Sequence, residues 1–229
     1  MPDTSRKVYG LAPSATDDYQ SLRLDVIRRR WDTKAQRWDT DLADESCHLN
    51  EDGAYARFLE TARGIVDQRA DFCCRHLLVD VGCGTGLVLA SLLGYFAEGL
   101  GLDISARMLA VARQRGLPRA RFAEGNCFEL GQCVQQAGAI VSRGILLSHY
   151  GTRWAGVLLG QVHAVVGEGG FALLDFLNAS CREQFAERPE NKTYFTAEEM
   201  AALTMEAGFA HFHILGEPWH RVRMLLLER

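Results

Sequence analysis

The feature of this chain that most constrains its fold is a glycine-rich turn directly after a continuous apolar run. The run covers 76–81, and the turn reads Gly82-Cys83-Gly84-Thr85-Gly86. A continuous apolar run is typical of a strand buried on both faces, as in a parallel sheet. Glycines after such a strand allow a tight turn and a close approach of backbone to a nucleotide. The turn therefore predicts a parallel α/β sheet with a ligand site at the carboxyl ends of its strands.

Apolar runs and helical patterns alternate along the rest of the chain. Strands are expected at 76–81, 99–103, 121–123, 139–142, 170–176, 211–215 and 222–227. Helices are expected at 87–93, 105–114, 154–166 and 196–207. This alternation predicts right-handed crossovers and a Rossmann-like, doubly wound α/β fold. The two final strands are separated only by a short turn with Gly216 and Pro218, which indicates one antiparallel strand.

The spacing of the glycines indicates which nucleotide the turn binds. A dinucleotide fingerprint reads GxGxxG, whereas this turn reads GxGxG and has Leu87 at the third dinucleotide position. Asp80 precedes the turn by two residues. A carboxylate there repels a pyrophosphate, which prefers positive charge, and attracts a ligand with an ammonium and a sulfonium. S-adenosylmethionine (SAM) has both groups, so the turn favours SAM over NAD.

Residues after the second and third strands can hold the nucleoside. Asp103 ends the second strand and can accept from both ribose hydroxyls; alternatively it caps a helix. Ile104 and Met108 lie on the adenine face or in the ordinary core. Asn126 can accept a hydrogen bond from the adenine amine, and the pair 127–128 can sandwich the adenine ring. Alternatively, Gly125 and Asn126 form an ordinary turn without a role in binding.

These motifs resemble those of class I SAM-dependent methyltransferases over residues 74–177. The resemblance rests on Val79-Asp80-Val81-Gly82-Cys83-Gly84-Thr85-Gly86, Leu102-Asp103-Ile104-Ser105 with Met108, Gly125-Asn126-Cys127, Val141-Ser142-Arg143-Gly144, Gly169-Gly170-Phe171 and Glu206-Ala207-Gly208-Phe209. It implies a seven-stranded sheet with the last strand antiparallel, and methyl transfer that yields S-adenosylhomocysteine. Many relatives carry Asp at the position of Asn126, whose Oδ1 is still an acceptor.

The resemblance and the residue patterns together give one set of expected donor-binding residues. They are Asp80, Gly82, Cys83, Gly84, Gly86, Asp103, Ile104, Met108, Asn126, Cys127, Phe128, Ser142, Arg143 and Trp38.

The segment 142–151, after the fourth strand, is expected to lie beside the methyl donor. It contains no proline, unlike the Asn/Asp-Pro-Pro-aromatic motif of nucleic-acid and glutamine methyltransferases. Ser142 and Asp175-Phe176 do not match the metal-binding pattern of catechol-type enzymes, so no metal is expected. His149 is a candidate base, or it packs beneath the sheet edge. Tyr150 and Arg143 are candidates for orienting an acceptor, and Arg143 can bind a substrate carboxylate or pair with a neighbouring acid.

The N-terminal part, residues 1–69, is expected to form a helical lid over a core of residues 70–229. Trp31 and Trp38 each precede an aspartate and lie seven residues apart, two helical turns on one face. They either wall the acceptor site or anchor the helix. Tyr194, between the fifth strand and the next helix, is a candidate acceptor contact or part of a surface loop.

Composition narrows the functional class. The net charge is −4 and 24% of residues are charged, so nothing resembles the basic footprint of a nucleic-acid binder. Neither a signal peptide nor a long apolar stretch is recognised, and the seven cysteines form no CxxC pair. We expect a cytoplasmic monomer or homodimer that methylates a small molecule, in secondary metabolism. A non-catalytic SAM-binding regulatory module and a nicotinamide oxidoreductase are the alternatives.

Overall fold

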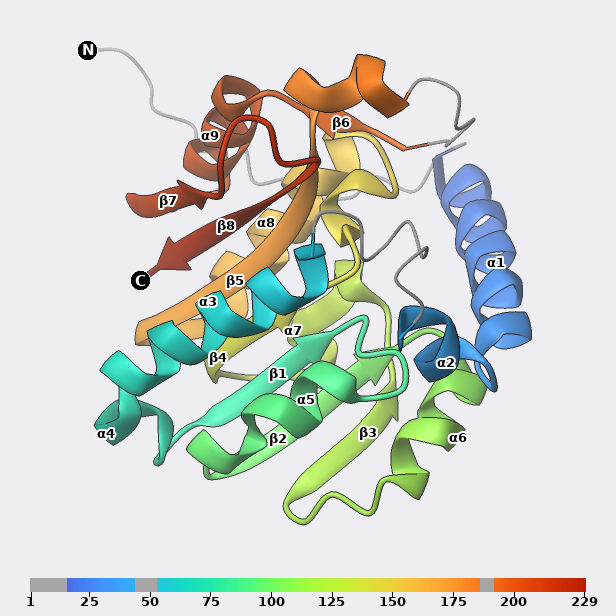
Figure 1. Ribbon diagram of the computed structural model, residues 1–229, viewed down its shortest axis with the longest axis vertical. Helices are drawn as coiled ribbons and strands as arrows, with labels where there is room; N and C mark the ends of the chain where they lie inside the picture. The colour runs from blue at the N-terminus through green and yellow to red at the C-terminus, as the bar shows by residue number, and fades with distance from the viewer. Residues whose placement is uncertain (1–15, 44–52, 186–191) are drawn as a thin grey trace.

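A computed structural model describes residues 16–43, 53–185 and 192–229, which form a central sheet with helices on both faces (Figure 1). The strands are β1 (Leu77–Val81), β2 (Glu98–Asp103), β3 (Ala120–Glu124), β4 (Ala137–Ser142), β5 (Val166–Asn178), β6 (Tyr194–Phe195), β7 (His211–Leu215) and β8 (Val222–Glu228). The α-helices are α1 (Thr16–Lys34), α2 (Trp38–Ala43), α3 (Ala54–Gln68), α4 (Ala70–Cys73), α5 (Leu87–Leu92), α6 (Ala106–Gln114), α7 (Leu130–Cys133), α8 (Thr152–Val165) and α9 (Ala197–Glu206). Short 3₁₀ turns are η2 (Leu93–Tyr95), η3 (Cys127–Glu129), η4 (Leu146–Ser148) and η5 (Ala179–Phe185).

The sheet has the strand order β3-β2-β1-β4-β5-β8-β7, and β6 pairs with β5. Strands β1 to β5 pair in parallel, whereas β8 runs antiparallel to both β5 and β7. The predicted Rossmann-like fold with an antiparallel last strand is confirmed. The sheet has eight strands because of β6, which pairs over two residues with Leu177 and Asn178. A strand that short carries no periodicity in the sequence.

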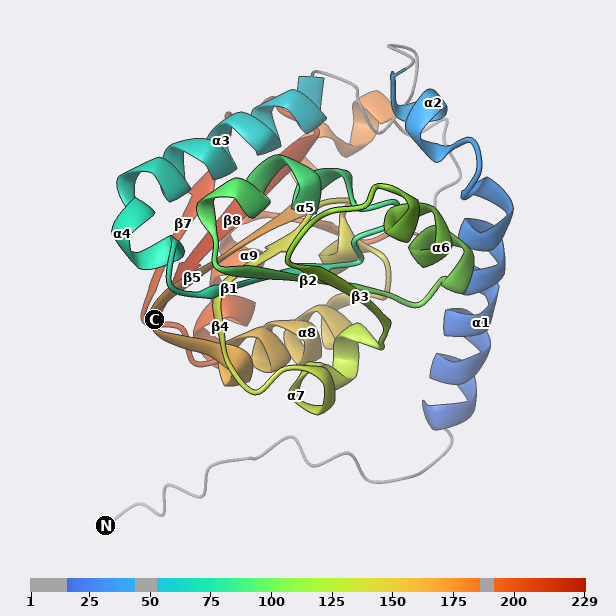
Figure 2. The same cartoon turned by 90° about the horizontal axis from the view of Figure 1, so that it is seen from below.

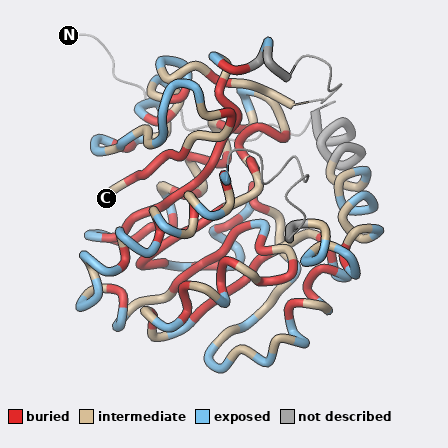
Figure 3. Tube along the Cα trace, viewed as in Figure 1, coloured by how far each residue is buried: buried red, intermediate tan, exposed pale blue. Residues whose placement is uncertain are grey.

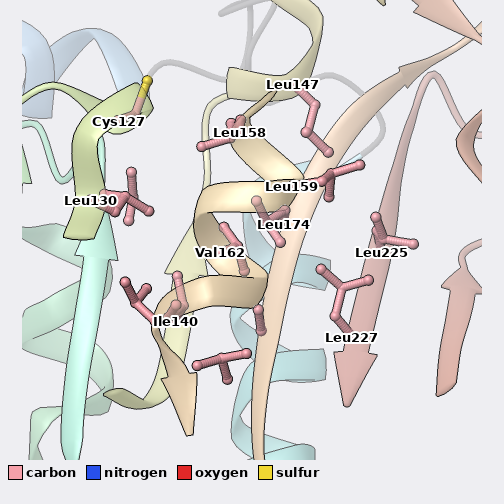
Figure 4. Packing of buried hydrophobic residues seen from close by; sticks show 14 of the residues in the cluster. Cys127, Leu130, Ile140, Leu147, Leu158, Leu159, Val162, Leu174, Leu225 and Leu227 are labelled. Atoms are coloured by element: carbon pink, nitrogen blue, oxygen red, sulfur yellow. The ribbon is translucent and has the colours of Figure 1, made fainter. Parts of the chain in front are cut away.

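Two apolar clusters hold the layers together, one on each face of the sheet (Figure 2). On one face, Leu158, Leu159 and Val162 of α8 point toward Leu174 of β5 and Leu225 of β8 (Figure 4). On the other face, α3 and α5 cover the same strands. The inner strands β1, β2, β4, β5 and β8 are buried along most of their length (Figure 3), whereas the edge strands β3 and β7 are not. Burial on both faces explains the continuous apolar sequence of the inner strands.

Trp31 and Trp38 do not share one helix, in contrast to the expected two turns on one face. The helix of Trp31 ends at Lys34, and Arg37 donates its backbone N–H to the Lys34 carbonyl in a turn before α2. Helix α1 lies beside α6 (Figure 2). Helix α3 instead buries Phe58, Ala62 and Val66, at four-residue spacing, in the core. In the described ranges no helix is long and apolar enough to cross a membrane.

Candidate active site

A cavity of about 510 Å³ lies at the carboxyl ends of the parallel strands. It is bordered by the glycine turn after β1, by Asp103 at the end of β2, and by the segment after β4. Trp31 and Trp38 from the N-terminal helices line it as well. This is the edge at which doubly wound sheets bind ligands, so we take the cavity as the candidate active site.

The glycine turn adopts backbone angles that favour glycine. Gly82, Gly84 and Gly86 have φ angles of 73°, 53° and 80°, where a Cβ would be strained. A Cβ on Gly84 would also lie 3.7 Å from the indole Nε1 of Trp38. The turn is anchored by Gly82, whose N–H donates to the Leu102 carbonyl over 2.7 Å. That distance is ordinary van der Waals contact, so the turn needs these glycines for its backbone path and not for the approach of Trp38.

Asp103 is fixed at the end of β2 by backbone donors. Its Oδ2 accepts from the Gly84 N–H and its Oδ1 from the Ser105 N–H, both over 2.8 Å. Burial raises the pKa of Asp103, and these hydrogen bonds act against that rise. Ser105, and not Asp103, caps α6, because its hydroxyl accepts from Met108. A carboxylate has about four acceptor sites, so Asp103 can still bind ribose hydroxyls.

Asp80 is the most perturbed carboxyl group of the cavity. Only 1% of its surface is exposed, and its Oδ2 has no hydrogen-bond partner among the described residues. Burial raises the pKa of Asp80 to about 7, and the nearby Asp103 adds to the rise. A buried acceptor without a donor is costly, and a ligand ammonium would supply the missing partner. The residues present therefore fit SAM.

The segment after β4 is held in place by Asp175 of β5. The Asp175 carboxylate accepts from the N–H groups of Gly144 and Ile145, the latter over 2.6 Å. Ile145 has a φ of 57°, unusual for a residue with a branched Cβ. Ser142 adds a second anchor by donating its hydroxyl to the Val81 carbonyl over 2.8 Å. Asp175 thus shapes the segment that presents Arg143, His149 and Tyr150 to the cavity.

Both ring nitrogens of His149 have partners. Its Nε2 lies 3.1 Å from the Gly144 carbonyl oxygen and its Nδ1 lies 2.8 Å from the Lys192 Nζ. A carbonyl only accepts and a charged lysine only donates, so Nε2 carries the proton and Nδ1 accepts. The ring lies 6.3 Å from Trp31 and is 7% exposed. His149 is therefore held rigidly at the cavity wall.

The Trp-Asp repeat serves two purposes. The rings of Trp31 and Trp38 meet edge to face, 5.0 Å apart, across the turn between α1 and α2. The neighbouring aspartates bind the core: Asp32 accepts from the Ser105 hydroxyl over 2.6 Å, and Asp39 accepts from Thr85 over 2.5 Å. Asp39 also pairs with Arg115. The tryptophans line the cavity while the carboxylates tether their helices.

Most of the predicted site residues line the cavity. They are Trp31, Trp38, Asp80, Gly82, Cys83, Gly84, Asp103, Ile104, Met108, Cys127, Ser142, Arg143, His149 and Tyr150.

Four predicted site residues lie outside the lining. Gly86 packs beneath it, where a Cβ would meet Phe122 at 3.1 Å. Asn126 uses its Oδ1 to accept from the Phe128 N–H and so caps η3. The Phe128 ring packs on Tyr150 and Trp154 within the core. Tyr194 accepts from Arg221 over 3.4 Å.

Several lining residues were not singled out from the sequence. Tyr55 of α3 lies under the Arg143 guanidinium, 5.1 Å from ring centre to Cζ, and burial raises its pKa to about 12. Arg30, Lys192 and Arg221 add positive charge to the lining. Lys192 lies two residues before Tyr194, in the connection after β5 for which an acceptor contact was expected. Nothing in the sequence marks Tyr55 or Arg221, whose positions depend on tertiary packing.

Two thiols also line the cavity, Cys83 in the glycine turn and Cys127 after β3. Burial raises the pKa of Cys83 well above its usual value and that of Cys127 to about 12. No group of three or more potential metal ligands occurs within the described ranges.

A GxGxG turn after β1, an acidic residue at the end of β2, and an antiparallel last strand define the class I SAM-dependent methyltransferases. Residues 78–170 match the family described as methyltransferase domain, and this part of the chain is similar to these enzymes.

The chain is also similar to individual proteins, in a short stretch of sequence or in fold. A stretch of 55 residues is 49% identical to trans-aconitate 2-methyltransferase of Deinococcus radiodurans, and covers 23% of this chain and 21% of that protein. The fold is similar to magnesium protoporphyrin IX methyltransferase (ChlM) from Synechocystis PCC 6803 with bound SAM, at 17% identity and a TM-score of 0.68 over 90% of this chain and 97% of the other. The fold is also similar to that in a DhpI-SAM-HEP complex, at 17% identity and a TM-score of 0.69 over 95% of this chain and 100% of the other.

Proposed function

We propose that this protein transfers the methyl group of SAM to a small-molecule acceptor without a metal ion. The observation that carries the proposal is the buried, unpartnered Oδ2 of Asp80 beside the glycine turn. A carboxylate in that position suits a cationic methyl donor, and Asp103 suits its ribose. The names of the relatives, which include trans-aconitate 2-methyltransferase and magnesium protoporphyrin IX methyltransferase, support a small-molecule acceptor.

The remaining roles follow from position in the cavity. Ile104, Met108 and Cys127 offer apolar contacts for the adenine, and Trp38 covers the glycine turn. Trp31, His149 and Tyr150 border the space left for the acceptor. Correct alignment of acceptor and donor alone can contribute several kcal/mol to methyl transfer. The expected place in secondary metabolism stays a prediction.

Titration calorimetry tests the donor. SAM and S-adenosylhomocysteine should bind to the natural protein, and NAD should not. Asp80→Ala should lose binding of SAM and of S-adenosylhomocysteine. Asp67→Ala is a matched control, because Asp67 lies on the exposed side of α3 and outside the cavity. Binding of NAD without SAM would contradict the proposal, and SAM binding without turnover on any acceptor would favour a regulatory module.

His149 is proposed as a residue that positions the acceptor side of the cavity. His149→Phe should retain binding of S-adenosylhomocysteine and lose turnover, since it removes both hydrogen bonds. His149→Gln can still donate to the Gly144 carbonyl and should recover part of the rate. A general base would behave differently, because glutamine cannot take a proton and both variants would then be equally inactive, at a typical cost of about 10²–10⁴-fold.

A further inference from the structure

The peptide group between Gly144 and Ile145 joins a buried carboxylate to the wall of the cavity. Its N–H donates to Asp175 Oδ1 over 2.6 Å, and its carbonyl oxygen lies 3.1 Å from His149 Nε2. A trans peptide group is planar, and its N–H and C=O point in opposite directions. Asp175 on one side and His149 on the other are therefore connected through one rigid unit.

This peptide group has an orientation that its own residues do not favour. Ile145 has a φ of 57°, and a residue with a branched Cβ keeps such an angle only when its surroundings fix it. Turning the peptide group over would return Ile145 to a negative φ, and it would break the contacts with Asp175 and His149 together. Asp175 opposes that change, since it also accepts from the Gly144 N–H, 3.1 Å from Oδ1 and 3.2 Å from Oδ2.

Asp175 acts on the turn from beneath the cavity. Its surface is 1% exposed, and it does not belong to the lining. Burial raises the pKa of Asp175, whereas Arg143 and the backbone donors of Ile145 and Gly144 act against the rise. Successive N–H groups in a turn form a concave site for an anion, and the Asp175 carboxylate fills that site.

The segment beyond the turn has anchors that do not involve Asp175. The Ser148 hydroxyl accepts from the Leu177 N–H over 2.9 Å, and the Ser148 carbonyl accepts from the Thr193 N–H over 2.9 Å. Loss of the Asp175 carboxylate should therefore change the turn and the contact of the His149 ring, while the end of the segment stays in place.

We propose that Asp175 is a positioning residue for methyl transfer, because it sets the orientation of the His149 ring through the peptide group between Gly144 and Ile145. This inference rests on the proposed function, in which His149 positions the acceptor side of the cavity. A misplacement of about 1 Å can cost on the order of 10²-fold in rate. Asp175→Ala should slow methyl transfer by on the order of that factor and should leave the affinity for S-adenosylhomocysteine close to that of the natural protein.

NMR of the protein with isotope-labelled histidine tests the connection without any acceptor. The Nε2 proton of His149, identified by its absence in His149→Phe, should give a signal that the hydrogen bond to Gly144 protects from exchange with water. Asp175→Ala should lose this signal. Asp175→Asn should keep it, since the amide Oδ1 can still accept from the N–H groups of the turn.

A second substitution separates positioning from a general effect on folding. Glycine adopts a positive φ without strain, so Asp175→Ala combined with Ile145→Gly should regain the His149 signal and part of the rate. Lost stability would not be repaired in this way, because Ile145→Gly also removes a buried side chain. Glu168→Gln, at the exposed other end of β5, is the matched control and should change neither quantity.

The outcomes separate the two proposals. Rates are measured with labelled SAM and a protein-free cell extract as the source of acceptors, and affinities by calorimetry with S-adenosylhomocysteine. If the natural protein methylates nothing, the proposed function fails and the inference fails with it. If it methylates, and Asp175→Ala keeps the His149 signal or the rate, only the role of Asp175 is overturned. The role is also overturned if the double variant regains neither, which decides the matter even where Asp175→Ala alone does not fold.

Discussion

At the scale of single residues, we expect the protonation of Asp80 to set how tightly the protein binds its donor. The pKa of Asp80 is about 7 in the protein, against 3.8 as its ordinary value. Pairing with an ammonium requires the ionised form. The affinity for S-adenosylhomocysteine should therefore rise about fivefold between pH 6 and pH 7 as Asp80 loses its proton. Calorimetry in buffers of different ionisation enthalpy should show that a proton is released on binding. Asp80→Asn should bind S-adenosylhomocysteine weakly, with an affinity that does not change between pH 6 and pH 7.

The same carboxyl group affects stability without ligand. Because its folded pKa lies above its unfolded pKa, the folded protein binds the extra proton between about pH 4 and pH 7. The contribution of Asp80 to stability is therefore largest at low pH and is lost as pH rises through that window. Urea unfolding at pH 5 and pH 7 should show a smaller loss for Asp80→Asn than for the natural chain; an equal loss would contradict the assignment.

The sequence predicted the donor side of the site better than the acceptor side. Asp80 and Asp103 lie at the carboxyl ends of β1 and β2, which converge on one edge of the sheet, so their positions in the chain suffice to place them. Asp175 acts through the backbone of Gly144, thirty-one residues away, and that contact exists only in the folded chain. Arg221 likewise reaches the cavity because β8 runs antiparallel to β5. Such contacts have no local signal in the sequence.

At the scale of elements, two carboxylates hold the N-terminal helices over the donor site. Asp39→Ala removes the hydrogen bond from Thr85 and the pair with Arg115. We expect S-adenosylhomocysteine to bind several-fold more weakly: a charge-assisted hydrogen bond is typically worth about 1.5–3 kcal/mol, and solvent screening reduces this because Asp39 is partly exposed. Trypsin should also cleave faster after Lys34 or Arg37, in the turn between α1 and α2.

Asp41→Ala is the matched control on the same helix. Its carboxylate pairs with the exposed Arg37 at i,i+4, and such surface pairs contribute only about 0.3–0.5 kcal/mol. Donor affinity and cleavage rate should stay close to those of the natural chain. Equal effects of the two substitutions would show that α2 itself, and not the tether, is responsible.

Elements with strong local signals were the most predictable. The helix α9 begins where Thr196 and Glu199 form the expected capping box, and Gly208 follows it with a φ of 104°. The break between α1 and α2 was not predicted. The Trp-Asp spacing fits a continuous helix equally well, and the ring contact of Trp31 with Trp38 survives the break.

At the scale of the whole molecule, the sheet separates two apolar layers of similar importance. Leu159 of α8 and Leu89 of α5 are both fully buried, one on each face. Replacing either by alanine should lower the free energy of unfolding by about 2–5 kcal/mol. In urea unfolding, the loss of free energy in the double variant should equal the sum of the two single losses within about 0.5 kcal/mol, because the two sites share no cavity. Met205→Ala, at an exposed position on α9, should change little.

The two thiols of the cavity bear on how long such an enzyme stays active. A sulfonium methyl donor is an alkylating agent, and thiolates are the side chains that it attacks most readily. With a pKa of about 12, Cys127 is ionised in about one molecule in 10⁵ at neutral pH. The burial of Cys127 in the cavity wall should thereby protect the protein from methylating itself.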